Sequence, residues 1–153
     1  MRVYLDTNII MIMEYFGHRN LFDPVCAVLK ASEQDAVQAC ISTNSLDTII
    51  YLLGLQLKDH GLHEPAKRQQ ICNILKSVLS FLDVVSIDKV GLISALDDHH
   101  FKDIEDSIQF HCAEENHADF LLTINTRHFK NAKGNVKILS PTEFVSQHLN
   151  AIQ

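Results

Sequence analysis

Carboxylate side chains occupy conspicuous positions at two places that lie far apart in this sequence. Asp6 interrupts an apolar opening, directly after the run Val3–Leu5 and just before another apolar stretch. Asp106 is followed three and four residues later by Gln109 and Phe110, so on a helix its face turns toward the interior. An unpaired carboxylate in a protein interior is costly. Both acids are therefore candidate catalytic or metal-binding residues rather than surface residues that only aid solubility.

If Asp6 and Asp106 converge in the fold, two like charges lie close together, and either one carboxyl group protonates or a cation neutralises both. Oxygen ligands with retained water molecules suit Mg²⁺ or Mn²⁺. Such an ion activates water and stabilises charge on a phosphoryl group. The two acids therefore predict metal-dependent hydrolysis of a phosphodiester, and this prediction fails if their carboxyl groups lie far apart.

Further polar side chains follow predicted strands or begin predicted helices. They are Asn44, Ser45 and Asp47, then Asp103 and Glu105 ahead of Asp106, and finally Asn125 after Thr123. Several have a purely structural explanation as well. Asp47 and Ser45 suit a helix N-terminus, and Asp103 suits the cap of a helix that starts near Ile104. The sequence leaves both explanations open.

Short apolar runs that are typical of strands alternate with longer segments of helical period. The predicted strands are Val3–Leu5, Val37–Ile41, Val84–Ile87, Phe120–Thr123 and Val136–Leu139. The predicted helices are Asn44–Lys58, Pro65–Leu82, one that starts near Ile104, and one that starts at the capping box Ser140-Pro141-Thr142-Glu143. The alternation predicts a mainly parallel sheet covered on both faces, a three-layer α/β/α sandwich formed by residues 1–153 as one domain. Ligands of such sheets bind at the carboxyl ends of the strands, where Asp6 falls.

Two segments carry a resemblance to a known family. The stretches "VYLDTNII" and "IEDSIQFHCAEENHADFLLTINTRHF" resemble the PIN domain, a small metal-dependent nuclease fold, with a spacing similar to that of VapC-type toxin ribonucleases. The resemblance covers most of the chain. It implies a divalent-metal-dependent endoribonuclease that uses Mg²⁺ or Mn²⁺ and cuts RNA to a 5′-phosphate and a 3′-hydroxyl.

The resemblance also implies roles for individual residues. Asp6 corresponds to the first metal ligand of the family and Asp106 to the main acid of its second cluster. Asn125 stands where many members have a fourth acid, and Glu105 and Asp103 would complete the metal shell through water. The supporting residues are Asn8, the polar partner in the opening motif, and Thr123, the small hydroxyl residue at a strand end.

The sequence departs from the family pattern at the second acid, which is usually a glutamate. That position falls on Thr48, with Asp47 one residue earlier, and one residue turns a helical side chain by about 100°. The alternative function is therefore a catalytically weakened PIN-like module that binds RNA or a partner protein. A phosphotransferase of the haloacid-dehalogenase type is disfavoured, because its second aspartate is replaced by Asn8.

Basic residues gather directly after Asn125. The segment Phe120–Thr142 contains no acid, and Arg127, His128 and Lys130 are expected to bind the phosphates of RNA beside the metal. The alternative for this segment is a solvated loop and helix face.

The composition limits the remaining possibilities. A net charge of -6 argues against a sequence-independent duplex binder, and no apolar run is long enough to span a membrane. Without a recognisable signal peptide, four scattered cysteines are expected to be reduced thiols of a cytoplasmic protein. The segments His60–His63 and Asp97–His100 have ligand-like spacing but are interpreted as solvated polar faces rather than zinc sites.

Partners are implied by the resemblance, since members are often toxins held by an antitoxin protein and commonly form homodimers. The apolar hairpin expected between Asn44 and Leu82, with its stretch "IIYLLGLQL", is a candidate surface for such a partner. Ordinary burial explains its apolar residues equally well.

Overall fold

The sheet of this protein has five strands, all parallel. The structure, a computed structural model, describes residues 1–14 and 19–149, and the side chains of residues 1–11 and 21–149. The strand order is β3-β2-β1-β4-β5. The strands are β1 (Arg2–Leu5), β2 (Gln38–Ser42), β3 (Asp83–Val85), β4 (Phe120–Leu122) and β5 (Lys137–Leu139). The central strand β1 therefore lies between β2 and β4.

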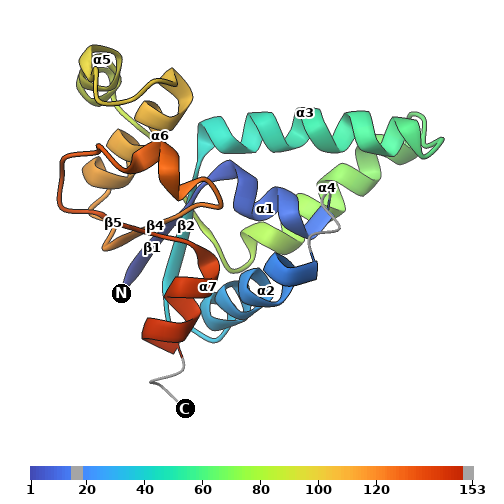
Figure 1. Ribbon diagram of the computed structural model, residues 1–153. Helices are drawn as coiled ribbons and strands as arrows, with labels where there is room; N and C mark the ends of the chain where they lie inside the picture. The colour runs from blue at the N-terminus through green and yellow to red at the C-terminus, as the bar shows by residue number, and fades with distance from the viewer. Residues whose placement is uncertain (15–18, 150–153) are drawn as a thin grey trace.

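Helices cover both faces of the sheet (Figure 1). On one face lie α1 (Thr7–Glu14), α2 (Arg19–Glu33), α3 (Thr43–Asp59), α4 (Ala66–Leu79) and α7 (Pro141–Phe144). The π-helical turn η2 (Val145–Leu149) follows α7. On the other face lie α5 (Lys89–Asp97), α6 (Ile104–Glu115) and the 3₁₀ turn η1 (Thr126–Phe129). This is the predicted α/β sandwich, and its sheet is parallel throughout the described residues.

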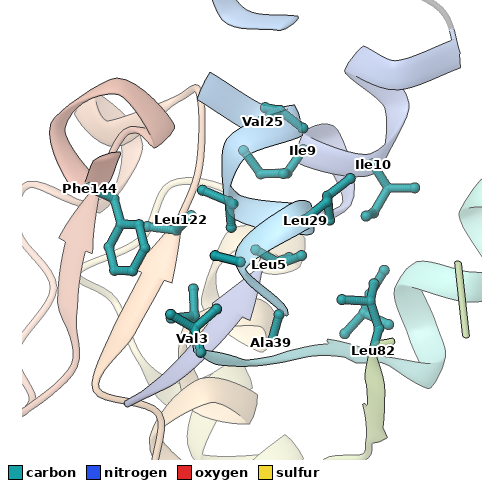
Figure 2. Close-up of a cluster of buried hydrophobic side chains, with 14 of the residues drawn as sticks. Val3, Leu5, Ile9, Ile10, Val25, Leu29, Ala39, Leu82, Leu122 and Phe144 are labelled. Carbon is teal, nitrogen blue, oxygen red and sulfur yellow. The ribbon is translucent and has the colours of Figure 1, made fainter. Parts of the chain in front are cut away.

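Alternate residues of β1 contribute their side chains to two apolar cores, one on each face of the sheet. Val3 and Leu5 lie in the larger core, together with Leu122 and Phe144 (Figure 2). Tyr4 points to the opposite face and packs with side chains of α6. All three β1 residues are fully buried, as expected for a parallel strand with helices on both sides. The strand that leads to Asp6 is thus held rigidly from both faces.

The observed elements differ from the prediction at several boundaries. Strand β3 ends at Val85, two residues earlier than predicted, and α4 ends at Leu79 instead of Leu82. The sequence patterns also do not predict α1, α2 or α5. Helix α5 exposes Val90, Ile93 and Leu96, so these large apolar residues do not mark its buried face. The last helix begins where predicted, and Ser140 and Glu143 form the expected capping box.

Within the described part of the chain, no helix is both long and apolar enough to cross a bilayer. The four cysteines, Cys26, Cys40, Cys72 and Cys112, are all free thiols in the structure.

Two glycines provide a matched test of this packing. A Cβ atom on Gly134 would lie 2.3 Å from Glu114 Oε1 and 2.8 Å from Phe110 Cζ. The Glu114 carboxylate cannot easily move, because it accepts hydrogen bonds from the backbone N–H groups of Asn135 and Val136 at 2.6 and 2.7 Å. A Cβ atom on Gly54, inside α3, meets nothing closer than Ile71 Cδ1 at 3.9 Å.

We therefore expect opposite effects from the same substitution. Gly134→Ala should lower the free energy of unfolding by about 1–3 kcal/mol through overpacking. Gly54→Ala should raise it by up to about 1 kcal/mol through helix propensity. Urea denaturation measures both values, and a Gly134→Ala protein as stable as the wild type would contradict the packing described here.

Candidate functional site

The carboxyl ends of β1 and β4 bring together residues that are more than a hundred positions apart in the sequence. Leu5 pairs with Leu122 in the parallel ladder, and the Asp6 N–H continues it by donating to the Leu122 carbonyl at 3.0 Å. Asp6 and Thr123 therefore leave the sheet side by side. The polar site is formed by the residues that directly follow these two strands.

A short hydrogen-bond network orients the Asp6 carboxylate. Its Oδ2 atom accepts from Asn8 Nδ2 and from Thr123 Oγ1, both at 2.7 Å. Asn8 Oδ1 in turn accepts from the backbone N–H of Ile124 at 3.3 Å, and Thr123 Oγ1 accepts from the N–H of Asn125 at 3.0 Å. Asn8 thus joins the start of α1 to the loop after β4, and the D-x-N motif of the sequence is a structural unit.

Asp6 and Asp106 line the same cavity of about 310 Å³. The other carboxylates on its wall belong to Asp103 and Glu105, and Asn125 and His128 also contribute. No lysine or arginine is among the described residues that line it. The fold thus gathers four acids, from β1 and α6, around one space.

The electrostatics of Asp6 reflect this crowding. The side chain is only 6% exposed. Burial raises its pKa to about 6, and the negative charge of Asp106 adds to the rise. The hydrogen bonds from Thr123, the Thr7 backbone and Asn8 partly offset both effects. Without a bound cation, the carboxyl group of Asp6 therefore stays protonated to a higher pH than that of an ordinary aspartate.

Asp106 is less buried, with 18% of its side chain exposed, and it forms an ion pair with His128. The distance from His128 Nδ1 to Asp106 Oδ2 is 3.0 Å. Partial burial raises the pKa of Asp106, and Asp103 raises it further, whereas the neighbouring His128 lowers it. His128 thus lies at the rim of the acidic cavity and contacts one of its acids.

The other predicted site residues fall in different places. Asp103 caps α6, with its carboxylate accepting from the Glu105 N–H at 2.7 Å, so its structural explanation holds although it also lines the cavity. Asp47 is exposed on α3 and does not line the cavity. The side chain that α3 supplies to the cavity wall is the apolar Leu52.

The cavity suits a hard divalent cation by the chemistry of its donors, which are carboxylate and amide oxygens with a crowded, buried acid among them. Within the described residues, no three Asp, Glu, His or Cys side chains form a ready-made metal cluster. An ion here would take few ligands from the protein and keep several water molecules, as Mg²⁺ commonly does.

A second cavity of about 480 Å³ adjoins the first and has basic character. Arg127, His128 and Lys130 all line it, as do Lys102, His100 and Asn131. Asp103, Asp106 and His128 belong to both cavities. We refer to this second cavity as the basic groove. Nothing in the sequence pattern places Lys102 or His100 beside the other three.

The Asp97–His100 segment is more than the solvated face that the sequence suggested. Asp98 accepts from His100 Nδ1 at 2.7 Å and from His111 Nε2 at 2.9 Å. Desolvation raises the pKa of Asp98, but the hydrogen bonds from His111 and from the backbone and side chain of His100 together outweigh it and lower the pKa to about 2. The carboxylate thus ties the turn after α5 to α6 and fixes His100 at the edge of the basic groove.

Comparisons with known proteins agree with this arrangement. The family model of the PIN domain matches residues 2–127. The chain therefore belongs to the PIN domain family, and the resemblance seen in the sequence is confirmed. No curated protein sequence matches the chain.

Two solved structures share the fold. One is VapBC2 from Rickettsia felis bound to a DNA fragment from their promoter, with 17% identity, a TM-score of 0.63, and coverage of 92% of this chain and 98% of that chain. The other is a toxin–antitoxin complex from Klebsiella pneumoniae, with 19% identity, a TM-score of 0.59, and coverage of 91% and 97%.

The pKa of Asp6 leads to a prediction about stability. Well below pH 4 the carboxyl group is protonated in both the folded and the unfolded chain, so its burial carries no ionisation cost. Well above pH 6 it is ionised in both states, and its burial then destabilises the folded state. Asp6→Asn removes this titration.

We therefore expect the unfolding free energy of metal-free Asp6→Asn, relative to the wild type, to rise between about pH 3 and about pH 8. The rise should be about 3 kcal/mol, since each pKa unit corresponds to about 1.4 kcal/mol. Urea denaturation in the presence of a chelator measures it. A difference that stays constant across this range would contradict the buried, crowded environment of Asp6.

Proposed function

We propose that this protein is a divalent-metal-dependent endoribonuclease. The observation that carries the proposal is the continuity of an acidic cavity with a basic groove through Asp103, Asp106 and His128. Four carboxylates on one side suit a hard cation, and Arg127, Lys130 and Lys102 on the other suit a phosphate backbone. A phosphodiester that follows the groove reaches the acids.

In this proposal Asp6 and Asp106 hold Mg²⁺ or Mn²⁺ directly, and Asn125, Glu105 and Asp103 contribute through water. When bound, the ion supplies an activated water molecule and stabilises charge on the phosphoryl group. Asn8 and Thr123 fix the orientation of Asp6, because both donate to its Oδ2 atom. The products expected are a 5′-phosphate and a 3′-hydroxyl.

In this proposal RNA is bound by Arg127, His128 and Lys130. All three are exposed and lie along one groove, where the charges of Arg127 and Lys130 are accessible to the phosphates of a strand. The hydrogen bond of His128 with Asp106 connects the groove to the acids. This supports a substrate path that ends at Asp106.

The second candidate is a PIN-like module that binds RNA or a protein without cutting. The observation that favours it is the contribution of α3, which supplies Leu52 to the cavity and no carboxylate, while Asp47 points elsewhere. A site with fewer acids binds a cation more weakly. Activity measurements separate the two candidates.

An antitoxin protein is part of the proposal, because one of the two similar structures is described as a toxin–antitoxin complex and the other as VapBC2. The supporting observation in this chain is the set of exposed apolar side chains on α3, which are Ile50, Tyr51 and Leu55. In Figure 1, α3 and α4 extend to one side of the molecule as a hairpin. A homodimer and a cytoplasmic location remain predictions.

The central test is cleavage of purified RNA by purified protein in the presence of Mn²⁺, with the new ends mapped. We expect the wild type to cut, and Asp6→Asn and Asp106→Asn each to lower the rate at least about 100-fold, because each loses a ligand charge. Asp59→Asn, at the exposed end of α3, is the matched control and should cut normally. Binding of RNA without cutting by the wild type would favour the second candidate, and cutting that survives Asp6→Asn would remove Asp6 from the mechanism.

The basic groove is tested separately through the salt dependence of binding. Binding to single-stranded RNA is measured in the Asp6→Asn background, so that no substrate is consumed. Arg127→Ala and Lys130→Ala should each weaken binding and reduce the slope of log K against log salt by about 0.7. Lys58→Ala, on the last turn of α3, should leave the slope unchanged. Equal slopes for all the proteins would place the RNA elsewhere.

A further inference from the structure

A buried hydrogen-bond network adjoins the acidic cavity and has no part in the mechanism described so far. Its members are five polar side chains from β1, α1, the start of α3 and α6, namely Tyr4, Thr7, Ser42, Ser45 and Gln109. Every one is buried, and Ser45 and Gln109 are 0% and 2% exposed. Polar groups that deep are costly unless their hydrogen bonds are satisfied.

Gln109 is the centre of this network. Its Oε1 atom accepts from the Tyr4 hydroxyl, and its Nε2 atom donates to Thr7 Oγ1 at 3.1 Å and to Ser45 Oγ at 3.0 Å. Thr7 Oγ1 donates to Ser45 Oγ at 2.8 Å, and Ser42 Oγ donates to the same atom at 3.0 Å. Both the oxygen and the nitrogen of the Gln109 side-chain amide thus form hydrogen bonds.

The position of the network relative to the two acids is informative. Thr7 is the residue directly after Asp6, and Gln109 lies three residues after Asp106, on the same face of α6. The Thr7–Gln109 hydrogen bond therefore joins the neighbour of one acid to the helix face that carries the other.

The same bond also connects opposite faces of the sheet. Helix α1 packs against α2 and α3, whereas α6 packs against α5 and β4. Two negative charges that face each other across this boundary tend to push α1 and α6 apart. A buried, fully bonded amide between the helices opposes that movement.

We propose that Gln109, acting through Thr7, is a positioning residue that sets the separation of Asp6 and Asp106 and with it the affinity of the site for a divalent cation. This inference rests on the proposed function, which supplies the cation. In this proposal α3 contributes to the site without a metal ligand. Its residue Ser45 holds the Gln109 amide in place by accepting a hydrogen bond at the hydroxyl oxygen.

The test is the affinity for Mn²⁺, measured by titration calorimetry on the intact chain. Thr7→Val keeps the shape of the side chain and removes both of its hydroxyl hydrogen bonds, so it should weaken Mn²⁺ binding at least tenfold. Thr7→Ser restores the hydroxyl group and should bind within about twofold of the wild type. Neither substitution changes a carboxylate.

The matched control is Ser107→Ala, also on α6. Ser107 is buried and donates to the Ala95 carbonyl at 2.7 Å, so its loss removes a comparable buried hydrogen bond that does not touch Thr7 or Gln109. Mn²⁺ affinity should stay within twofold of the wild type in this variant. Urea denaturation of each protein measures its loss of stability, and variants that are too unstable are compared in the Gly54→Ala background, which is expected to stabilise α3.

The possible results distinguish the positioning role of Gln109 from the proposed function. Mn²⁺ binding by Thr7→Val equal to that of the wild type overturns the positioning role and leaves the proposed function intact. An equal loss in Thr7→Val and Ser107→Ala also overturns it, because the network is then merely structural. A wild type that binds no Mn²⁺ overturns the proposed function, and the positioning role falls with it.

Discussion

The burial of the Asp6 carboxylate in a cavity that it shares with Asp106 is the constraint on which the rest of this structure depends. Asp6 is almost completely buried, and its carboxyl group has a pKa near 6 because burial and Asp106 both penalise the ionised form. The fold accepts that cost and offsets part of it with donors from Asn8 and Thr123. An arrangement of this kind is maintained where a charged group has a task beyond stability.

The strand order explains why the acids meet at this place. The chain first builds the sheet outward from β1 through β2 to β3, and then crosses to the other side of β1 to add β4 and β5. The switch point therefore lies between β1 and β4, where ligands of open parallel sheets bind. Asp6 follows β1, Thr123 follows β4, and Asp106 lies in the first turn of α6, the helix that precedes β4. Topology alone brings these three residues to the same crevice.

The sequence predicts those features that depend on local pattern. Apolar runs followed by polar residues predict the strands and place Asp6 at a strand end, and a run without acids predicts the basic character that Arg127 and Lys130 give the groove. Features that depend on partners far away in the chain escape such a prediction. Gln109 is an unremarkable helical residue in the sequence, and only the fold reveals its bonds to Tyr4 and Thr7.

The same distinction applies to the polar residues of α3 and to α5. Ser45 and Asp47 both suit a helix N-terminus, but Ser45 is fully buried in the network and Asp47 is exposed, a difference of orientation that no composition encodes. Helix α5 escapes prediction because its exposed apolar residues do not follow the usual amphipathic pattern. A regular pattern predicts helices whose large apolar residues share the buried face, whereas α5 packs on α6 through small residues such as Ala95 and exposes its larger ones.

Among the described residues that line the acidic cavity, α3 supplies no carboxylate, and this has a physical consequence for the site. An additional carboxylate from α3 would add a ligand for the cation but also a further negative charge beside Asp6, whose pKa is already raised to about 6. Neutral Ser45 and Gln109 supply rigidity at the same boundary without that repulsion. In the proposed function, metal binding and loss of the Asp6 proton are coupled in one equilibrium, since a bound cation favours the ionised carboxylate. The affinity of such a site depends on how accurately its neutral neighbours hold the carboxylates.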